Sequence, residues 1–285
     1  LKRLGVPRAQ HEPKATDEEN IREMIRFIGG MIANGSAYEA GGDVYFKVRT
    51  FKDYGKLSGQ SIEHMLENVR IEKDDKKEDP LDFALWKKSK PGEPAWDSPW
   101  GKGRPGWHIE CSCMSLKHLK CETLDIHGGG RDLQFPHHEN EIAQAEAFTG
   151  KPFAKYWMHH GLLTIDKQKM SKSLGNFITI EQAVDRYGAD VLKLFFLAAH
   201  YGSSVDFSEE KMQEAAKQRE KIVSFLTRAR DFSRQADPLD SPRVFGYRDR
   251  LVEAMDDDFN TARAMGIFFD FMNEMNKEMD RPSPA

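Results

Sequence analysis

The sequence predicts an α/β domain that is followed by an all-α, helical-bundle domain. Residues 123–165 combine a strand, a glycine-rich turn, a helix and a second strand. This order is typical of α/β folds that place ligands at the carboxyl ends of their strands. From about residue 180 onward the apolar residues keep a helical period to the end of the chain. The two patterns together predict a mixed domain with a helical extension.

The composition is that of a globular protein without a membrane segment. Of 285 residues, 31% are charged and 39% are apolar, and the length suits two or three domains. The net charge of −4 neither predicts nor excludes a nucleic-acid partner, which would need a local basic patch. No apolar run approaches the roughly 18 residues of a membrane span. Cys111, Cys113 and Cys121 cluster within eleven positions, which favours free thiols and a cytoplasmic location.

The first part of the chain is predicted to form short helices and a strand. Residues 1–13 are polar and irregular. Thr16 and Glu19 have the spacing of a capping box before a helical apolar period, and Gly35 can end that helix. Residues 42–48 alternate as a strand does, and residues 61–69 predict a second helix.

The middle of the chain contains the α/β pattern. The charged run 74–79 predicts a solvated connector rather than a recognition patch. Prolines, glycines and tryptophans over residues 90–106 indicate an ordered loop. A strand over 123–127 is expected to enter a triple-glycine turn, followed by a helix over 137–148 that Gly150 ends. A further buried strand is predicted over residues 156–165.

The last part of the chain predicts helices only. Their apolar residues, which include several methionines and phenylalanines, are interpreted as core rather than as a cofactor site. The expected helices cover residues 180–187, 189–200, 208–232, 247–255 and 261–279.

A possible metal site comes from His137 and Glu141. These residues stand four apart, so one helix face presents both side chains. A thiolate from a separate element, Cys111 or Cys113, would complete a set that favours zinc. Spacing alone does not decide between the two cysteines. The alternative interpretation is a helix-capping cluster, with the cysteine a buried small hydrophobe.

A possible phosphate-binding site comes from glycines and lysines. Gly130, which ends the triple glycine, would allow close approach of a ligand, and Asp132 could accept a hydrogen bond from a ribose hydroxyl. Lys169, Lys172 and Ser171 lie on one short polar segment that suits a polyphosphate whose charge grows as its bond breaks. The alternatives are a plain tight turn and a solvated loop.

Several longer motifs resemble those of one enzyme family. Residues 169–173 read KMSKS, the motif of class I aminoacyl-tRNA synthetases. Together with GWHIEC at 106–111, DIHGGGRDLQFPHHENE at 125–141 and MDDDFNTARA at 255–264, the chain resembles the cysteinyl-tRNA synthetase family over essentially its whole length. The resemblance implies a Rossmann-like catalytic half-domain with a connective insertion, followed by a helical domain.

The resemblance also implies an amino-acid site. Cys111, His137 and Glu141 match the family's zinc ligands, with one Zn²⁺ per subunit that binds the thiolate of the substrate cysteine. Trp107 and His127 match residues that line the amino-acid pocket. Cysteine and serine differ mainly at sulfur and oxygen, and a soft cation distinguishes them where packing does so weakly.

On the nucleotide side, the resemblance implies that Gly130 and Asp132 hold the ribose of ATP. Lys172 matches the lysine on the ATP phosphates, with Lys169 and Ser171 beside it. The implied reaction is attack by the carboxylate of L-cysteine on the α-phosphate of ATP, used with Mg²⁺, and transfer of cysteine to tRNA(Cys). We expect Lys169 and Lys172 to be catalytic, and the protein to be a monomer without a membrane partner.

One family motif is missing. None of the ten histidines lies in the His-x-Gly-His motif of class I synthetases, and the family's remaining zinc ligand, a cysteine, has no counterpart here. We therefore expect the chain to lack the first half of the nucleotide-binding fold and the anticodon-binding end, and to be inactive in isolation. The implied divisions are 1–100 connective insertion with the end of the first catalytic half, 101–165 second half of the Rossmann-like catalytic domain with the zinc site, 166–205 KMSKS and stem-contact region, and 206–285 helical (DALR-like) tRNA-binding domain.

Two other functions are compatible with these residues. One is a ligase that joins cysteine to an amino sugar, of the type used in mycothiol synthesis, on the same scaffold. The other is a zinc-stabilised RNA-binding module without catalysis. The helices from Ser208 and the motif at 255–264 favour the tRNA ligase over the first, and the intact KMSKS segment argues against the second.

Overall fold

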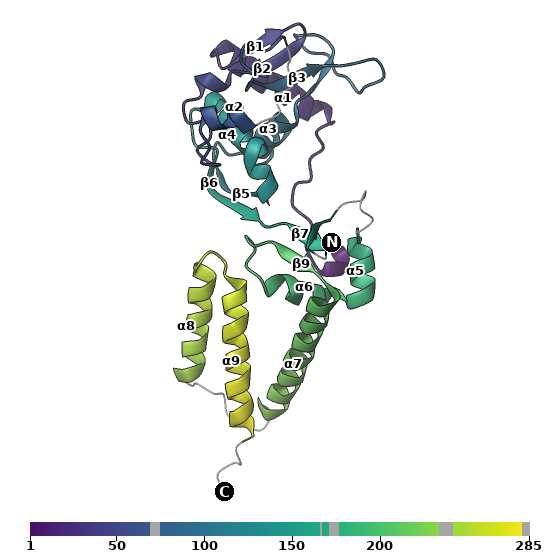
Figure 1. The fold of residues 1–285 in the computed structure, drawn as a ribbon, viewed down its shortest axis with the longest axis vertical. Coiled ribbons are helices and arrows are strands. Elements are labelled where there is room, and N and C mark those ends of the chain that lie inside the picture. The colour runs from purple at the N-terminus through teal and green to yellow at the C-terminus, as the bar shows by residue number, and fades with distance from the viewer. Residues whose placement is uncertain (69–74, 166, 171–176, 234–241, 281–285) are drawn as a thin grey trace. The chain divides into compact units, whose positions relative to one another are not determined.

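The protein divides into two compact units, residues 9–159 and residues 1–8 with 160–285. The computed structural model (Figure 1) describes the chain except for residues 69–74, 166, 171–176, 234–241 and 281–285. No helix in the described part is both long enough and apolar enough to span a membrane. The four-part division implied by the resemblance stays a prediction.

The unit of residues 9–159 contains a four-stranded antiparallel sheet of order β1-β2-β3-β4. Only the second strand was predicted, because the others are short and lack a clear alternation. The helix α1 (Glu18–Ala33) packs its apolar stripe, from Ile21 to Met31, into the same core as this sheet. The strands are β1 (Ala37–Ala40), β2 (Asp43–Phe46), β3 (Phe83–Lys88) and β4 (Gly103–Pro105).

The start of α1 differs from the prediction. The N-cap residue is Asp17, in extended conformation, and no side chain caps the helix. The predicted capping box of Thr16 and Glu19 is therefore wrong, because Thr16 lies one position outside the N-cap and its hydroxyl does not reach the first turn. The predicted second helix is present as α2 (Ile62–Asn68).

Two helices and two strands in the same unit carry the candidate site. These are α3 (Trp107–Leu119), which was not predicted, α4 (Glu139–Thr149), and the paired strands β5 (Leu124–Gly130) and β6 (Ala154–His160). The segment η4 (Gln134–His138), which is kinked at the extended residue Phe135, leads into α4, and Gly150 ends α4 with a φ of 69°. The predicted helix over 137–148 is therefore present, with its regular part beginning at Glu139.

The triple glycine belongs to strand β5, so the predicted glycine-rich turn is wrong. The reason is close packing on the strand. A Cβ on Gly129 would lie 2.7 Å from Cε1 of His138, whereas one on Gly128 would make only an ordinary contact, 3.5 Å from the carbonyl oxygen of Met158. Gly129 is thus required by a neighbouring imidazole rather than by a turn.

The strand predicted over residues 156–165 is two strands, and the first is not buried. Tyr156 in β6 is 68% exposed, and the second strand, β7 (Leu163–Ile165), belongs to a different sheet. Gly161 separates them and donates its backbone N–H to the carbonyl of Tyr201. A Cβ at this position would lie 2.1 Å from the Ser203 carbonyl oxygen, so Gly161 packs closely against the backbone of Ser203.

The second unit combines a small sheet with helices. The strand order is β8-β7-β9, with β7 antiparallel to β8 (Gln168–Lys169) and parallel to β9 (Val205–Phe207). The helices lie close to their predicted ranges, except that α8 begins at Pro242 rather than at residue 247. Thr179 forms a capping box with Gln182 at the start of the first helix. They are α5 (Ile180–Tyr187), α6 (Ala189–Leu197), α7 (Glu209–Ser233), α8 (Pro242–Asp256) and α9 (Thr261–Met279) (Figure 1).

Candidate metal centre

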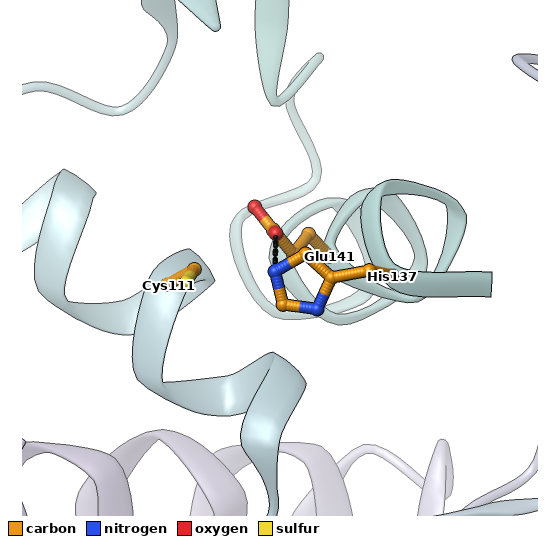
Figure 2. A group of neighbouring side chains, drawn as sticks. All are labelled: Cys111, His137 and Glu141. Carbon is orange, nitrogen blue, oxygen red and sulfur yellow. Dashed lines mark ion pairs between the residues drawn. The ribbon is translucent and has the colours of Figure 1, made fainter. Parts of the chain in front are cut away.

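The fold brings the three predicted metal ligands together. Cys111 lies on α3, His137 on the last turn before α4, and Glu141 in the first turn of α4. Figure 2 shows His137 and Glu141 together on one helical segment, with Cys111 on the helix beside it. One potential ligand atom from each residue lies within 4.8 Å of those of the other two. Cys113, the alternative thiol, is buried in the hydrophobic core instead.

Glu141 is a fully buried carboxylate between two imidazoles. Nε2 of His137 lies 2.7 Å from its Oε1, and Nε2 of His127 lies 3.0 Å from its Oε2. Burial opposes ionisation, but the two imidazoles outweigh it and lower the pKa of Glu141. Neither oxygen accepts an aligned hydrogen bond from any described residue. A buried, ionised carboxylate of this kind fits a cation, which would supply the missing partner.

Cys111 has the chemistry of a ligand that needs the metal. Burial, followed by the nearby carboxylates of Glu141 and Glu110, raises the pKa of the Cys111 thiol to about 12. At neutral pH the thiol therefore keeps its proton unless a cation displaces it. Thiolate, imidazole and carboxylate together are a donor set that zinc accepts. The residues present thus fit the metal that the resemblance implies.

His108 holds the ring of His137 and was missed by the sequence reasoning. Nδ1 of His108 lies 2.8 Å from Nδ1 of His137, so one ring donates to the other. Burial, then the His137 ring, lowers the pKa of His108 to about 4, which leaves it neutral at pH 7. A hydrogen bond on the far nitrogen of a ligating histidine fixes its ring and tautomer. The contact joins two separate elements, so spacing carried no signal of it.

Trp107 and His127, predicted to line an amino-acid pocket, both contact the cluster. The indole of Trp107 is 56% exposed and stacks on His137, with ring centroids 4.1 Å apart. His127, on β5, pairs with Glu141 as described. These contacts place one exposed aromatic surface and one imidazole beside the three candidate ligands.

A second set of candidate ligands shares the same carboxylate. One atom each of His127, His138 and Glu141 also lie within 4.8 Å of one another. His138 is buried, which lowers its pKa to about 4, and its Nδ1 lies 2.8 Å from Nε2 of His159. This set contains no thiol, so it is a poorer match for a soft cation than the first. Sequence reasoning assigned no role to His138 or His159.

The residues predicted to hold ATP are less completely described. Gly130 is the buried end of β5, and Asp132 is exposed on the short helix that follows. Lys169 contributes its backbone to β8. The side chain of Lys169, and Ser171 and Lys172 entirely, lie outside the described residues. The roles of these five residues stay predictions.

Comparisons with known proteins identify relatives over the whole chain. The family model described as "tRNA synthetases class I (C) catalytic domain" matches residues 1–217, and a "DALR domain" model matches residues 250–285. The protein named cysteine–tRNA ligase in Thermodesulfovibrio yellowstonii is 53% identical over 99% of this chain and 60% of its own length. The one in Geobacter sulfurreducens is 53% identical over 98% of the chain and 60% of its own length. The chain thus spans about three fifths of these relatives.

Solved structures confirm the predicted fold class. Mycobacterium tuberculosis methionyl-tRNA synthetase in complex with methionyl-adenylate has a TM-score of 0.68 at 14% identity, covering 99% of this chain and 70% of that one. A leucyl enzyme, Agrobacterium radiobacter K84 agnB2 LeuRS with tRNA, has a TM-score of 0.53 at 14% identity, covering 68% of this chain and 29% of that one. At this identity the likeness concerns the fold alone.

Proposed function

We propose that the protein containing this chain is a cysteine–tRNA ligase, on the premise that the chain belongs to the family of class I (C) tRNA synthetase catalytic domains. The relatives that match almost all of it carry that name. The reaction would join L-cysteine to AMP at the expense of ATP, with Mg²⁺, and then transfer cysteine to tRNA(Cys). The names favour this function over an amino-sugar ligase and over an RNA-binding module.

The observation that carries the proposal is the cluster of Cys111, His137 and Glu141. These residues would hold one Zn²⁺, which when bound supplies a soft acid that prefers a thiolate to a hydroxyl. Glu141 keeps its negative charge inside the unit, and Cys111 releases a proton to a base when it becomes a ligand. Selection of cysteine over serine would then rest on the donor atom of the substrate rather than on its volume.

Other residues would position the substrates. Trp107 covers His137 with an exposed indole and is suited to close one side of an amino-acid pocket. His127 would line the same pocket from β5. In our proposal Gly130 and Asp132 contact the ribose of ATP, while Lys169, Ser171 and Lys172 hold its phosphates. The lysines would stabilise the charge that develops on the pyrophosphate as the α-phosphate is attacked.

The cellular location and the oligomeric state of the protein are also proposals. The three cysteines are free thiols in this structure, which suits a reducing compartment, and we propose a cytoplasmic location. We further propose that the protein acts as a monomer.

The test uses the full-length protein and measures ATP–pyrophosphate exchange with cysteine or serine as substrate, together with metal content. We expect exchange with cysteine, very little with serine, and about one zinc per chain. Equal exchange with both amino acids, or activity without bound zinc, would contradict the proposed selection. Acylation of tRNA and of amino sugars, compared in the same preparation, separates the ligase from the amino-sugar alternative.

A further inference from the structure

The loop of residues 54–58 packs against the helical segment that carries two of the candidate metal ligands. This loop lies between β2 and α2, in the same unit as α4, and begins with the buried residues Tyr54 and Gly55. Gly55 has a left-handed φ of 97°, and a Cβ there would lie 2.0 Å from the carbonyl oxygen of Gln60. The backbone of the 54–58 loop is therefore closely constrained.

Glu139 joins the first turn of α4 to this loop. Its side chain is fully buried, and both of its carboxylate oxygens accept hydrogen bonds from successive backbone N–H groups. The N–H of Ser58 donates to Oε2 at 2.9 Å, and the N–H of Leu57 donates to Oε1 at 3.4 Å. Because a buried carboxylate is costly without such donors, these contacts hold the two elements together.

Two more hydrogen bonds connect the same elements. Nε2 of Gln134 donates to the carbonyl of Leu57 at 2.8 Å, and the hydroxyl of Tyr54 donates to Oδ1 of Asn140 at 2.5 Å. Burial, followed by the negative charge of Glu139, raises the pKa of Tyr54, so this hydroxyl keeps the proton that it donates. The contacts with the loop thus lie on both sides of the ligating histidine in the sequence.

Glu139 and the candidate ligand Glu141 project from opposite sides of one helical turn, because residues two apart on an α-helix differ by about 200°. The beginning of this helix has little other support. Its N-cap residue, His138, makes no side-chain capping hydrogen bond, and the preceding segment is kinked at Phe135. The 54–58 loop therefore supports the side of the turn that faces away from the metal cluster shown in Figure 2.

We propose that Glu139 is a positioning residue of the metal centre. Through the backbone of the 54–58 loop it fixes the turn from which His137 and Glu141 project, without being a ligand itself. A metal site needs its ligands held to within about 0.5 Å, and groups behind the ligands contribute about 10–100-fold to metal affinity. The inference rests on the proposed function, because it concerns the zinc that this centre would hold.

The test compares Glu139→Gln with Glu146→Gln in the full-length protein. Glu146 also contacts the loop, through Lys56 at 2.6 Å, but it lies more than one helical turn beyond Glu141. Glutamine keeps the size of the side chain, but its amide NH₂ is a donor and leaves a backbone N–H without an acceptor. In competition with a chelator, we expect Glu139→Gln to bind zinc about tenfold more weakly. Glu146→Gln should bind zinc as the parent does.

Cobalt bound in place of zinc distinguishes positioning from general stability, because its absorption bands depend on the geometry of its ligands. We expect the bands to change in Glu139→Gln and not in Glu146→Gln. A lower unfolding midpoint with unchanged affinity and an unchanged spectrum would overturn the proposal.

Tyr54→Phe, which removes a single hydroxyl, is the milder second variant. It should weaken zinc binding in the same direction, and the loss in the double variant should be smaller than the product of the two single losses. If Glu139→Gln fails to fold, parental zinc affinity in Tyr54→Phe would overturn the proposal.

Failure of this inference is distinguishable from failure of the proposed function. If the parent binds zinc but shows no cysteine-dependent exchange, and Glu139→Gln still weakens zinc binding, the enzyme assignment is wrong and the role of Glu139 stands. If exchange is normal and the Glu139 and Glu146 variants bind zinc alike, the enzyme assignment stands and the positioning role is wrong. A parent that binds no zinc would overturn both.

Discussion

Nδ1 of His108 lies 2.8 Å from Nδ1 of His137, on the side of the ring away from Glu141. This contact makes His108 a positioning residue for a candidate ligand. Replacing it by Phe should lower zinc affinity by about 10–100-fold, because the ring of His137 loses its hydrogen bond with His108 on that side. Competition with a chelator measures the effect. His118→Gln, at the other end of α3, is the control, and equal affinity in both variants would remove His108 from the centre.

The two overlapping ligand sets can be separated by neighbouring histidines. We expect His137→Ala to lose zinc and to raise the apparent KM for cysteine. His138→Ala should retain zinc, because His138 belongs only to the set without a thiol. Metal content per chain and the kinetics of exchange are the measurements. Full zinc in the His137 variant, or loss only in the His138 variant, would reassign the site.

A methyl group on strand β5 would make an ordinary contact at Gly128 but would overlap the His138 ring at Gly129. Gly129→Ala should destabilise the unit by about 1–3 kcal/mol and disturb the His138 ring, because the new Cβ overlaps it. Gly128→Ala, where the contact is an ordinary 3.5 Å, should cost much less. Denaturant unfolding of the two variants gives the comparison. If they unfold alike, the close packing of Gly129 does not matter.

Metal affinity should depend on pH through the Cys111 thiol. Binding releases its proton, so zinc affinity is expected to rise about tenfold per pH unit near neutrality from this group alone. Cys111→Ser should bind zinc weakly and lose this part of the slope.

In the metal-free protein the folded thiol, with a pKa of about 12 against an ordinary 9.0, keeps a proton that the unfolded chain releases. The metal-free fold is therefore expected to lose stability as the pH rises above about 9.

Lys172 tests the nucleotide side of the proposal. In the full-length protein, Lys172→Ala should lower the rate of adenylate formation much more than it weakens cysteine binding, because its charge is needed as pyrophosphate departs. Single-turnover kinetics and cysteine titration separate the two effects. Lys193→Ala on α6 serves as the control. Equal losses in rate and binding would indicate a binding role instead.

Much of the fold followed from local pattern. The helices α5 and α9 begin and end at the predicted residues, because each has a strong apolar period and a clear start signal. The short strands β1, β3 and β4 were missed, since three to six residues carry little periodicity. The triple glycine was read as a turn because close packing against His138 leaves no mark on the sequence.

The sequence by itself determined the types of ligand and the pairing of His137 with Glu141, because four residues make about one helical turn. Only the tertiary structure decided between Cys111 and Cys113. Both lie on α3, two positions apart, and so they point to different sides of that helix. The contact of His108 with His137 was likewise decided by packing. Such contacts join elements far apart in the chain, which no local pattern specifies.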